Sequence, residues 1–226
     1  MAESPPSARG LLTTRPREPT ERGGGAGLTS LAHGAELYVP PTYDPASPNA
    51  LVLTLHGARA GPRSGFEQLL PLADEAGLIL LGPQSQRESW DILCGGYGPD
   101  VVAIDELLDD VFRRYAIDPR RIFASGFSDG ASYALSLGLT NGDVFAGLAA
   151  FSPGFAETHT RRGKPHVFIS HGTDDRVIPI APTSRRIVPR LRREGYDVTY
   201  REFAGPHIVP PEIAREAVEW LGRGRT

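Results

Sequence analysis

Residues 122–135 read IFASGFSDGASYAL: an apolar run, a serine between glycines, and then a run of helix-forming residues. The serine and its neighbours, Gly126 to Gly130, match the pattern G-x-S-x-G, which is typical of a sharp turn from a β-strand into an α-helix. Small residues are needed at both glycine positions because two backbones pass closely there, and the serine hydroxyl then projects above the sheet. The stretch therefore predicts a strand–turn–helix unit with Ser128 at its tip. An ordinary glycine-rich turn would fit the same pattern, so the partner residues decide between the two interpretations.

Apolar runs of strand length recur on both sides of this unit. Several are unbroken rather than alternating, which is typical of strands that are buried on both faces of a parallel sheet. The runs are residues 35–39, 50–55, 78–81, 122–125, 148–151, 167–170 and 198–201. Amphipathic stretches of helical period lie between them, at residues 66–76, 100–115, 129–139, 184–194 and 211–221. Strands that alternate with helices predict an α/β fold with a mostly parallel central sheet and helices on both faces.

The N-terminal segment differs in composition from the rest of the chain. Residues 1–32 are rich in Pro, Gly, Arg, Glu and Thr, and only residues 10–13 have the character of a short strand. Such a composition buries little apolar surface, so we expect residues 1–32 to form a flexible arm or an edge strand. Residues 33–226 are then expected to form a single domain. Residues 1–10 lack the apolar core of a secretory signal, and no apolar run is long enough to predict a membrane span.

Composition and charge exclude several classes of protein. The chain has 226 residues, of which 40% are hydrophobic and 23% are charged, as in an ordinary globular domain and unlike collagen, coiled coils or disordered chains. Its net charge is −3, so nothing favours binding to nucleic acid or to an anionic membrane surface. The single cysteine, Cys94, cannot form an internal disulfide, which favours a reducing compartment, and we expect a cytoplasmic protein. The sequence leaves a homodimer as open as a monomer.

The first partner that Ser128 needs is a general base, because a serine hydroxyl is barely ionised near pH 7. In sheets of this kind ligands bind at the carboxyl ends of the strands, so the base should directly follow a strand. His207 follows the last predicted strand and precedes the last helix. The other histidines are expected to be solvated or to shape loops: His33, His56, His159, His166 and His171. His207 is therefore the predicted base.

The base in turn needs a carboxylate that orients its ring and stabilises the imidazolium. Asp174 and Asp175 both follow the strand at 167–170, and on position alone either can be the acid. The order along the chain is then serine, aspartate, histidine. This is the order of the α/β-hydrolase fold, and it differs from the orders of trypsin-like and subtilisin-like proteases.

A tetrahedral intermediate also needs N–H donors for its oxyanion. We expect one from the backbone of Asp129, the residue after the serine, and the other from the loop at 56–61, where Ala58 is the best-placed donor. Arg59 in that loop is either a substrate contact or a solvated charge. Trp90 follows the strand at 78–81 and is expected to line the substrate pocket, although packing within its loop would also account for it.

Missing features narrow the chemistry further. Residues 152–165, which follow the strand at 148–151, are too few and too polar for an apolar helical cap. We therefore expect an open, shallow cleft bordered by Trp90 and by Phe155 in the following loop. Cys94 lies outside the turn, which disfavours a cysteine nucleophile. The sequence has no zinc, P-loop or dinucleotide motif, so we predict no metal and no cofactor.

Residues 37–221 resemble the small carboxylesterase/phospholipase group of the α/β-hydrolases, which includes the acyl-protein thioesterase-like enzymes. The matching pieces are Leu55-His56-Gly57, Pro83-Gln84-Ser85, Ser89-Trp90-Asp91, Gly126–Gly130, His171-Gly172 with Asp175, Ile178 and Pro179, and Gly205 with His207. The resemblance implies a compact esterase or thioesterase that needs no cofactor. It also selects Asp175 over Asp174, because the acid of this group is the fifth residue counted from the histidine of the His-Gly pair. Two positions depart from the group: Ala58-Arg59 stands where relatives often carry Leu-Gly or Gly-Gly, and Pro206 replaces a frequent glycine.

The sequence thus predicts a serine hydrolase that cleaves carboxylic esters or thioesters of short-to-medium acyl chains through an acyl-enzyme. Ser128 is the predicted nucleophile, His207 the base and Asp175 its partner, and the substrate is a small-molecule ester. A peptidase or a polyester depolymerase of the same fold is the alternative within this chemistry. A binding protein of the same fold without catalysis is the alternative outside it.

Overall fold

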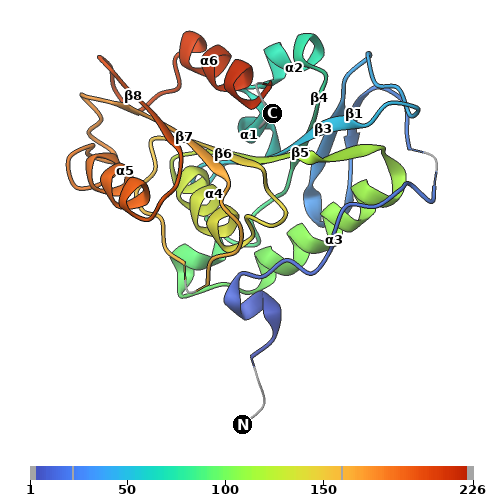
Figure 1. Ribbon diagram of the computed structural model, residues 1–226, viewed down its shortest axis with the longest axis horizontal. Coiled ribbons are helices and arrows are strands. Elements are labelled where there is room, and N and C mark those ends of the chain that lie inside the picture. The colour runs from blue at the N-terminus through green and yellow to red at the C-terminus, as the bar shows by residue number, and fades with distance from the viewer. Residues whose placement is uncertain (1–3, 22, 159, 223–226) are drawn as a thin grey trace.

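The computed structural model describes residues 4–21, 23–158 and 160–222. One eight-stranded sheet runs through the middle of the molecule, in the order β1-β2-β4-β3-β5-β6-β7-β8 (Figure 1). Strands β3 to β8 pair in parallel, whereas β1 and β2 are antiparallel to their neighbours. The strands are β1 Gly27–Ser30, β2 Glu36–Val39, β3 Asn49–Leu55, β4 Leu78–Gly82, β5 Ile117–Phe127, β6 Gly147–Phe151, β7 His166–Gly172 and β8 Val198–Phe203.

Helices cover both faces of the sheet (Figure 1). On one face lie α1 (Pro62–Phe66), α2 (Leu70–Ala76) and α6 (Pro211–Gly222). On the other face lie α3 (Pro99–Arg114), α4 (Asp129–Thr140) and α5 (Ser184–Arg193). Short 3₁₀ turns are present at Pro6–Arg9, Ala32–Gly34 and Asp91–Cys94. The predicted fold class, an α/β-hydrolase with a mostly parallel sheet between helical layers, is confirmed.

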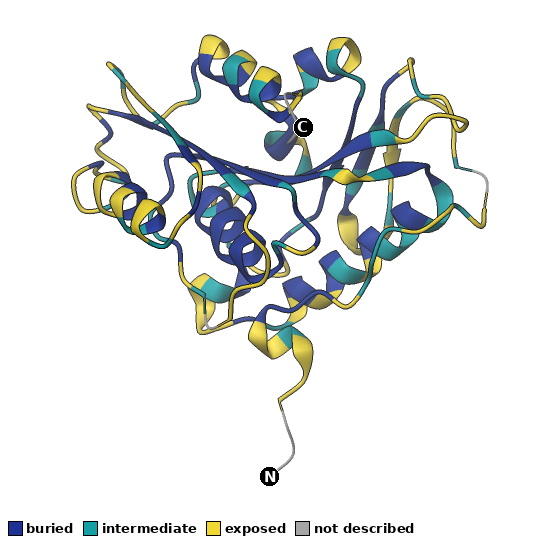
Figure 2. Ribbon diagram, in the orientation of Figure 1, coloured by how far each residue is buried: buried dark blue, intermediate teal, exposed yellow. Residues whose placement is uncertain are grey.

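Strands β3, β4, β6 and β7 are buried on both sides, as their unbroken apolar runs predict. Val52, Leu80 and Phe123 pack with Phe66 and Val218 between the sheet and the layer of α1, α2 and α6. The larger apolar cluster fills the opposite side, under α3, α4 and α5. Figure 2 shows the result: the central strands and the inward faces of the helices are buried, and the outward faces of the helices are exposed. Each large apolar side chain removed from water contributes about 1.5–3 kcal/mol, which makes these two layers the main source of stability.

The predicted helix at 66–76 is two helices in the structure. Helix α1 ends at Phe66, and α2 begins at Leu70 with Pro71 in its first turn. Proline has no N–H and its ring clashes with the carbonyl group four residues earlier, so one continuous helix could not pass through this position. The other predicted helices and strands differ from the observed ones mainly at their ends, and β5 is longer than expected because it begins at Ile117.

The N-terminal segment contacts the domain more closely than its composition predicts. Leu11 and Leu12 are buried, and the N–H groups of Thr13 and Thr14 donate to the Asp105 carboxylate on α3. Residues 10–13 form no strand. The strand of this segment is β1, which lies at the edge of the sheet beside β2. The division of the chain into residues 1–32 and 33–226 stays a prediction.

In the ranges that the structure describes, none of the helices has the length and the apolar run needed to cross a lipid bilayer. The segment between β6 and β7, residues 152–165, contains no helix in its described part. It therefore adds no helical cap over the sheet edge at which β5 and β6 end.

Candidate active site

Ser128 lies at the sharp turn between β5 and α4. Its backbone has φ 60° and ψ −121°, a conformation that side-chain-bearing residues rarely adopt and that is often found at functional sites. The glycines on either side make the turn sterically feasible. A Cβ atom at Gly130 would lie 2.0 Å from the carbonyl oxygen of Leu55, and one at Gly126 would lie 2.3 Å from that of Gly130. The Ser128 N–H donates to the Phe151 carbonyl group at 2.9 Å, which ties the turn to the end of β6.

Asp175 and His207 meet at the same edge of the sheet. His207 Nδ1 lies 2.5 Å from Asp175 Oδ2. The other oxygen, Oδ1, accepts hydrogen bonds from the backbone N–H groups of Val177 and Ile178. Burial by itself would raise the pKa of Asp175, but the His207 hydrogen bond and the two amides outweigh it and hold that pKa below its usual value. The carboxylate is therefore ionised and aimed at the histidine.

The ring of His207 lies beside the serine turn, and its second nitrogen is unpaired. The ring packs against Phe127, the residue before Ser128, with centroids 4.5 Å apart. Its Nε2 atom is buried and makes no hydrogen bond with any residue that the structure describes. A neutral histidine whose Nδ1–H is bound to a carboxylate has exactly one basic nitrogen left, and here it is this unpaired Nε2. The structure thus brings Ser128, Asp175 and His207 to one edge, as the sequence predicts, and their catalytic roles are taken up below.

A buried histidine lies behind Asp175. His171 Nε2 lies 2.7 Å from the Ile178 carbonyl oxygen and 3.2 Å from Asp175 Oδ2, and its Nδ1 lies 2.7 Å from Ser184 Oγ. Because a carbonyl oxygen can only accept, Nε2 carries the proton and Nδ1 accepts from the serine hydroxyl. Burial lowers the pKa of His171, which agrees with a neutral ring. His171 therefore supports the loop from which Asp175 projects.

The two predicted oxyanion donors belong to segments that adjoin Ser128. A Cβ atom at Gly57 would lie 3.6 Å from Ser128 Cβ, so the loop that carries Ala58 runs directly beside the serine. Asp129 is the first residue of α4, and backbone N–H groups of a first helical turn have no partner within the helix. The Asp129 carboxylate points elsewhere, since it accepts a hydrogen bond from Ser89 Oγ at 2.6 Å. The role of these two backbone N–H groups as oxyanion donors stays a prediction.

The structure corrects the predicted role of Trp90 as a pocket-lining residue. Its side chain is fully buried, stacks on Tyr133 of α4 with centroids 4.9 Å apart, and donates its indole N–H to the His56 carbonyl oxygen. Such a side chain has no surface for a substrate. Trp90 instead packs beneath the loop at 56–61, which is the alternative that the sequence leaves open.

Arg59 and Phe155 differ in what they can offer a substrate. The Arg59 side chain is 79% exposed and pairs with Glu88, which is the behaviour of a solvated surface charge. Its backbone has a positive φ of 56° and its N–H donates to the Glu88 carbonyl oxygen, so this residue serves mainly to shape the loop. Phe155 is partly exposed in the loop after β6. A contact of either residue with substrate stays a prediction.

Asp91 and Asp100 hold the loop at 83–98 through hydrogen bonds to its backbone and to each other's backbone N–H groups. The sequence does not predict them as a pair. Asp100 accepts from the backbone N–H groups of Gln86 and Asp91, each at 2.7 Å. Asp91 in turn accepts from the N–H groups of Gly98 and Asp100. Burial raises the pKa of Asp100. Their spacing of nine residues carries no recognisable pattern, so only the fold could reveal the arrangement.

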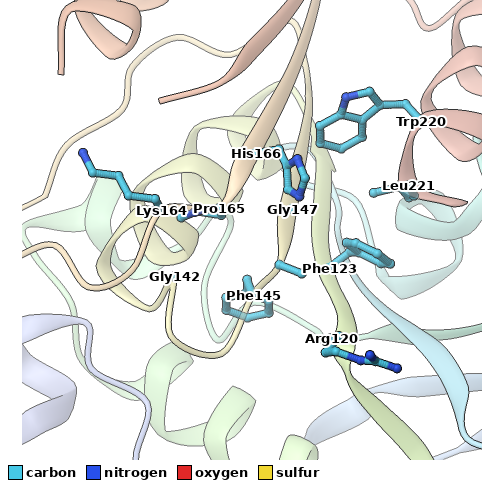
Figure 3. Close-up of a pocket in the computed structure, with 11 residues that line it drawn as sticks. Arg120, Phe123, Gly142, Phe145, Gly147, Lys164, Pro165, His166, Trp220 and Leu221 are labelled. Atoms are coloured by element: carbon cyan, nitrogen blue, oxygen red, sulfur yellow. The ribbon is translucent and has the colours of Figure 1, made fainter. Parts of the chain in front are cut away.

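The clearest cavity lies at the opposite edge of the sheet. It measures about 320 Å³ and is lined at the amino ends of β6 and β7 by Gly147 and His166, together with Phe123 and Trp220 (Figure 3). Figure 3 shows the Lys164 side chain extending away from these rings, and its Nζ donates to the Glu194 carbonyl oxygen. This cavity is remote from Ser128 and is not the reaction site. Among the described residues, no three His, Cys, Asp or Glu side chains are grouped as metal ligands.

Curated relatives of this chain include several esterases. It is 30% identical over 125 residues to feruloyl esterase B of Thermothelomyces thermophilus. The aligned region covers 51% of this chain and 42% of the relative. It is 28% identical over 151 residues to a bifunctional acetylxylan esterase/xylanase of Neocallimastix patriciarum, covering 63% and 21%. It is 32% identical over 130 residues to a poly(3-hydroxybutyrate) depolymerase of Ralstonia pickettii, covering 48% and 26%. The chain spans less than two thirds of the length of each of these relatives.

Solved structures support the fold. A thermostable esterase superposes with a TM-score of 0.71 at 22% identity over 88% of this chain and 62% of that one. The esterase PE8 gives 0.68 at 21% identity over 88% and 99%, and SOBER1 of Arabidopsis thaliana gives 0.62 at 18% identity over 77% and 98%. At such identities the likeness concerns the fold alone. The family model described as Phospholipase/Carboxylesterase matches residues 101–217, more than half of the chain and most of the site described above. The chain therefore belongs to the phospholipase/carboxylesterase family of the α/β-hydrolases.

Proposed function

We propose that this protein is a serine hydrolase that cleaves carboxylic esters or thioesters through an acyl-enzyme. One observation carries the proposal: the Asp175–His207 pair leaves a single unpaired ring nitrogen beside the strained turn that presents Ser128. Strain at a non-glycine residue and a buried unpaired nitrogen are both costly, and they are typically retained where chemistry requires them. Family membership supports the same conclusion.

The mechanism follows from these positions. Ser128 Oγ attacks the acyl carbonyl carbon while His207 Nε2 takes the hydroxyl proton, and Asp175 stabilises the imidazolium that results. The N–H groups of Ala58 and Asp129 donate to the oxyanion of the tetrahedral intermediate. When the bond to the alcohol or thiol breaks, His207 returns the proton to that leaving group. A water molecule, deprotonated by the same Nε2, then attacks the acyl-enzyme and releases the acid and the free serine.

The substrate class is proposed from the surroundings of Ser128. Since the described part of residues 152–165 adds no helical cap beside the ends of β5 and β6, the site should accept small-molecule esters of short-to-medium acyl chains from solvent. Two of the relatives are named as esterases, a feruloyl esterase and an acetylxylan esterase, and a third is named as a poly(3-hydroxybutyrate) depolymerase. A polyester is the second candidate substrate for that reason. Every group that the mechanism needs belongs to this chain, so the proposal includes no cofactor and no metal.

The proposal is tested by labelling and by turnover. Wild-type protein and Ser128→Ala are treated with a fluorophosphonate probe, and each is assayed on nitrophenyl esters and acyl thioesters of graded chain length. We expect labelling and hydrolysis in the wild type and neither in the variant. A folded wild type that neither reacts with the probe nor hydrolyses any ester would support the binding-protein alternative instead. A polyester film in the same panel separates the second substrate class.

Location and partners complete the proposal. The single cysteine, Cys94, is exposed and free, which fits a reducing cytoplasm. The net charge of −3 favours a small-molecule partner over nucleic acid. A homodimer remains a prediction, for which sedimentation or light scattering is the direct measurement.

A further inference from the structure

The imidazole of His56 is buried directly beneath the oxyanion loop, and the proposed mechanism gives it no role. It lies one residue after β3, is 1% exposed, and both of its ring nitrogens have backbone partners. Nδ1 lies 2.8 Å from the carbonyl oxygen of Gly57, and Nε2 lies 3.1 Å from the N–H of Ser85. The ring thus connects the oxyanion loop to the loop that follows β4.

These two contacts determine where the ring carries its proton. The Ser85 N–H is a donor, so Nε2 must be the acceptor and must be unprotonated. The proton therefore sits on Nδ1, which donates it to the Gly57 oxygen. Only this neutral tautomer satisfies both contacts. Burial lowers the pKa of His56, which agrees with a neutral ring.

The hydrogen bond from His56 to the Gly57 carbonyl oxygen also fixes the direction of the Ala58 N–H. The Gly57 C=O and the Ala58 N–H belong to one trans peptide plane, in which they point in opposite directions. An interaction that holds the oxygen on the side of the His56 ring therefore holds the N–H on the opposite side. The Ala60 N–H donates to the same Gly57 oxygen at 3.3 Å, so rotation of this peptide would break two hydrogen bonds.

The Gly57–Ala58 peptide lies against the proposed nucleophile. A Cβ atom at Gly57 would lie 3.6 Å from Ser128 Cβ and 3.7 Å from the Phe127 carbonyl oxygen, so the chain touches the serine turn one residue before Ala58. Ala58 itself is exposed, and no buried packing of its own side chain orients its backbone. Orientation must come from the peptide's other end.

We infer that His56 is a positioning residue, whose Nδ1–H holds the Gly57–Ala58 peptide so that the Ala58 N–H faces the oxyanion formed at Ser128. The sequence predicts for His56 only a role in shaping its loop. The inference rests on the proposed function, because it assigns a role within that reaction. Ser85 N–H, the His56 ring and the Gly57–Ala58 peptide form one chain of hydrogen bonds that is complete before substrate arrives, and such preorganisation is what makes an oxyanion donor effective.

Two substitutions of similar size test separately the two hydrogen bonds of His56, the one to Gly57 and the one from Ser85. In His56→Asn, the amide nitrogen can occupy the position of Nδ1 and still donate to Gly57, while the acceptor for Ser85 is lost. In His56→Gln, the amide oxygen can reach the position of Nε2 and still accept from Ser85, while the donor to Gly57 is lost. We expect His56→Gln to lower kcat by about 10- to 100-fold, less than the roughly 10²–10³-fold cost of deleting an oxyanion donor outright. We expect His56→Asn to retain at least about five times more kcat than His56→Gln, because the donor to Gly57 stays in place.

The pattern of the kinetic constants distinguishes positioning from a general loss of structure. An oxyanion donor acts in the transition state, so kcat should fall while KM stays within about twofold. The same two substitutions at His33, whose ring is partly exposed and pairs with Glu106, are the matched controls and should leave both constants unchanged. Assays are run well below the melting temperature of each variant, which circular dichroism supplies. Equal kcat for the Asn and Gln variants, or a higher kcat for Gln, would overturn the inference.

A second measurement does not depend on activity. Nitrogen-15 NMR of the imidazole rings in folded wild-type protein reports the tautomer of each histidine. His56, assigned by its disappearance in His56→Gln, should carry its proton on Nδ1, whereas His171 should carry it on Nε2. An Nε2–H or a doubly protonated His56 at pH 7.5 would overturn the inference even in an active enzyme. If the wild type shows the expected tautomer but hydrolyses no ester, the result contradicts the proposed function, and the positioning role of His56 is rejected together with it.

Discussion

His171 Nε2 lies 3.2 Å from Asp175 Oδ2, the same oxygen that lies 2.5 Å from His207 Nδ1. One carboxylate oxygen thus faces two imidazole rings, one fully buried and neutral, the other at the edge of the site. His171 also donates to the Ile178 carbonyl group, while the Ile178 N–H donates to Asp175 Oδ1. The loop from 175 to 178 is therefore held from both sides, and its carboxylate has little freedom to turn away from His207.

This arrangement makes Asp175 and Asp174 sharply different despite their adjacency. Asp175 is buried and bound to His207, whereas Asp174 is exposed. Asp175→Asn should reduce kcat by up to about 10⁴-fold, because an amide favours the wrong histidine tautomer and cannot stabilise the imidazolium. Asp174→Asn is the matched control and should change kcat by less than about threefold, as expected of an exposed position. Steady-state kinetics on one nitrophenyl ester compares the kcat of the two variants. A larger loss of kcat in Asp174→Asn than in Asp175→Asn would assign the role of the acid to Asp174.

The two buried histidines predict how stability depends on pH. Burial lowers the pKa values of both His56 and His171 in the native state, so below the unfolded value of about 6.5 the unfolded chain binds more protons. The free energy of unfolding should be constant above that pH and should fall below it. The slope should be up to about 1.4 kcal/mol per pH unit for each histidine.

Urea unfolding between pH 8 and pH 5.5 measures this slope. The variant His171→Gln cannot gain a proton at that position, so its unfolding free energy should decline less steeply than that of the wild type. His33→Gln removes a partly exposed histidine instead and is the control for the substitution itself. Parallel curves for wild type and His171→Gln would show that His171 is not held neutral.

Gly130, two residues after Ser128, should be irreplaceable. In Gly130→Ala, the added Cβ would lie 2.0 Å from the Leu55 carbonyl oxygen, a backbone atom that can move only with β3. We expect a loss of about 3 kcal/mol or more in the free energy of unfolding, at the upper end of overpacking effects, and a loss of turnover. Gly25→Ala is the control, since a Cβ there would meet nothing within 4 Å. Equal melting temperatures for the two variants would contradict the close packing at the turn.

Kinetics at the solubility limit test the open site. Because the described part of residues 152–165 forms no helix, no apolar lid has to be displaced by a lipid surface. The rate on a medium-chain ester should therefore follow a simple saturation curve through the concentration at which the ester forms micelles. A sharp rise at that concentration would mean that a segment closes over Ser128 in solution.

Much of the fold can be predicted from the sequence because the buried strands carry unbroken apolar runs and the helices carry a clear period. The one missed strand is β1, Gly27–Ser30, which is short and largely exposed and owes its strand conformation to pairing with β2. The three proposed catalytic residues follow strands, and strand ends are what a sequence pattern locates well. Trp90 was misplaced because position after a strand does not say whether a side chain points into solvent or beneath its own loop. The partners of His56 and His171 come from other loops, and no local pattern encodes such contacts.

Asn141, the residue that follows α4, is fully buried and its carboxamide is bound entirely to backbone. It donates to the carbonyl groups of Gly10 and Leu137 and accepts from the N–H of Leu12. The far end of α4, the helix that follows Ser128, is thereby anchored to a segment of chain more than a hundred positions earlier. Removal of residues 10–12 would leave the buried Asn141 carboxamide with only the Leu137 carbonyl group as a partner, and it would expose the apolar surface beneath Leu11 and Leu12. The N-terminal segment thus covers the C-terminal end of α4, and its sensitivity to proteases should report on whether that end of the helix is intact.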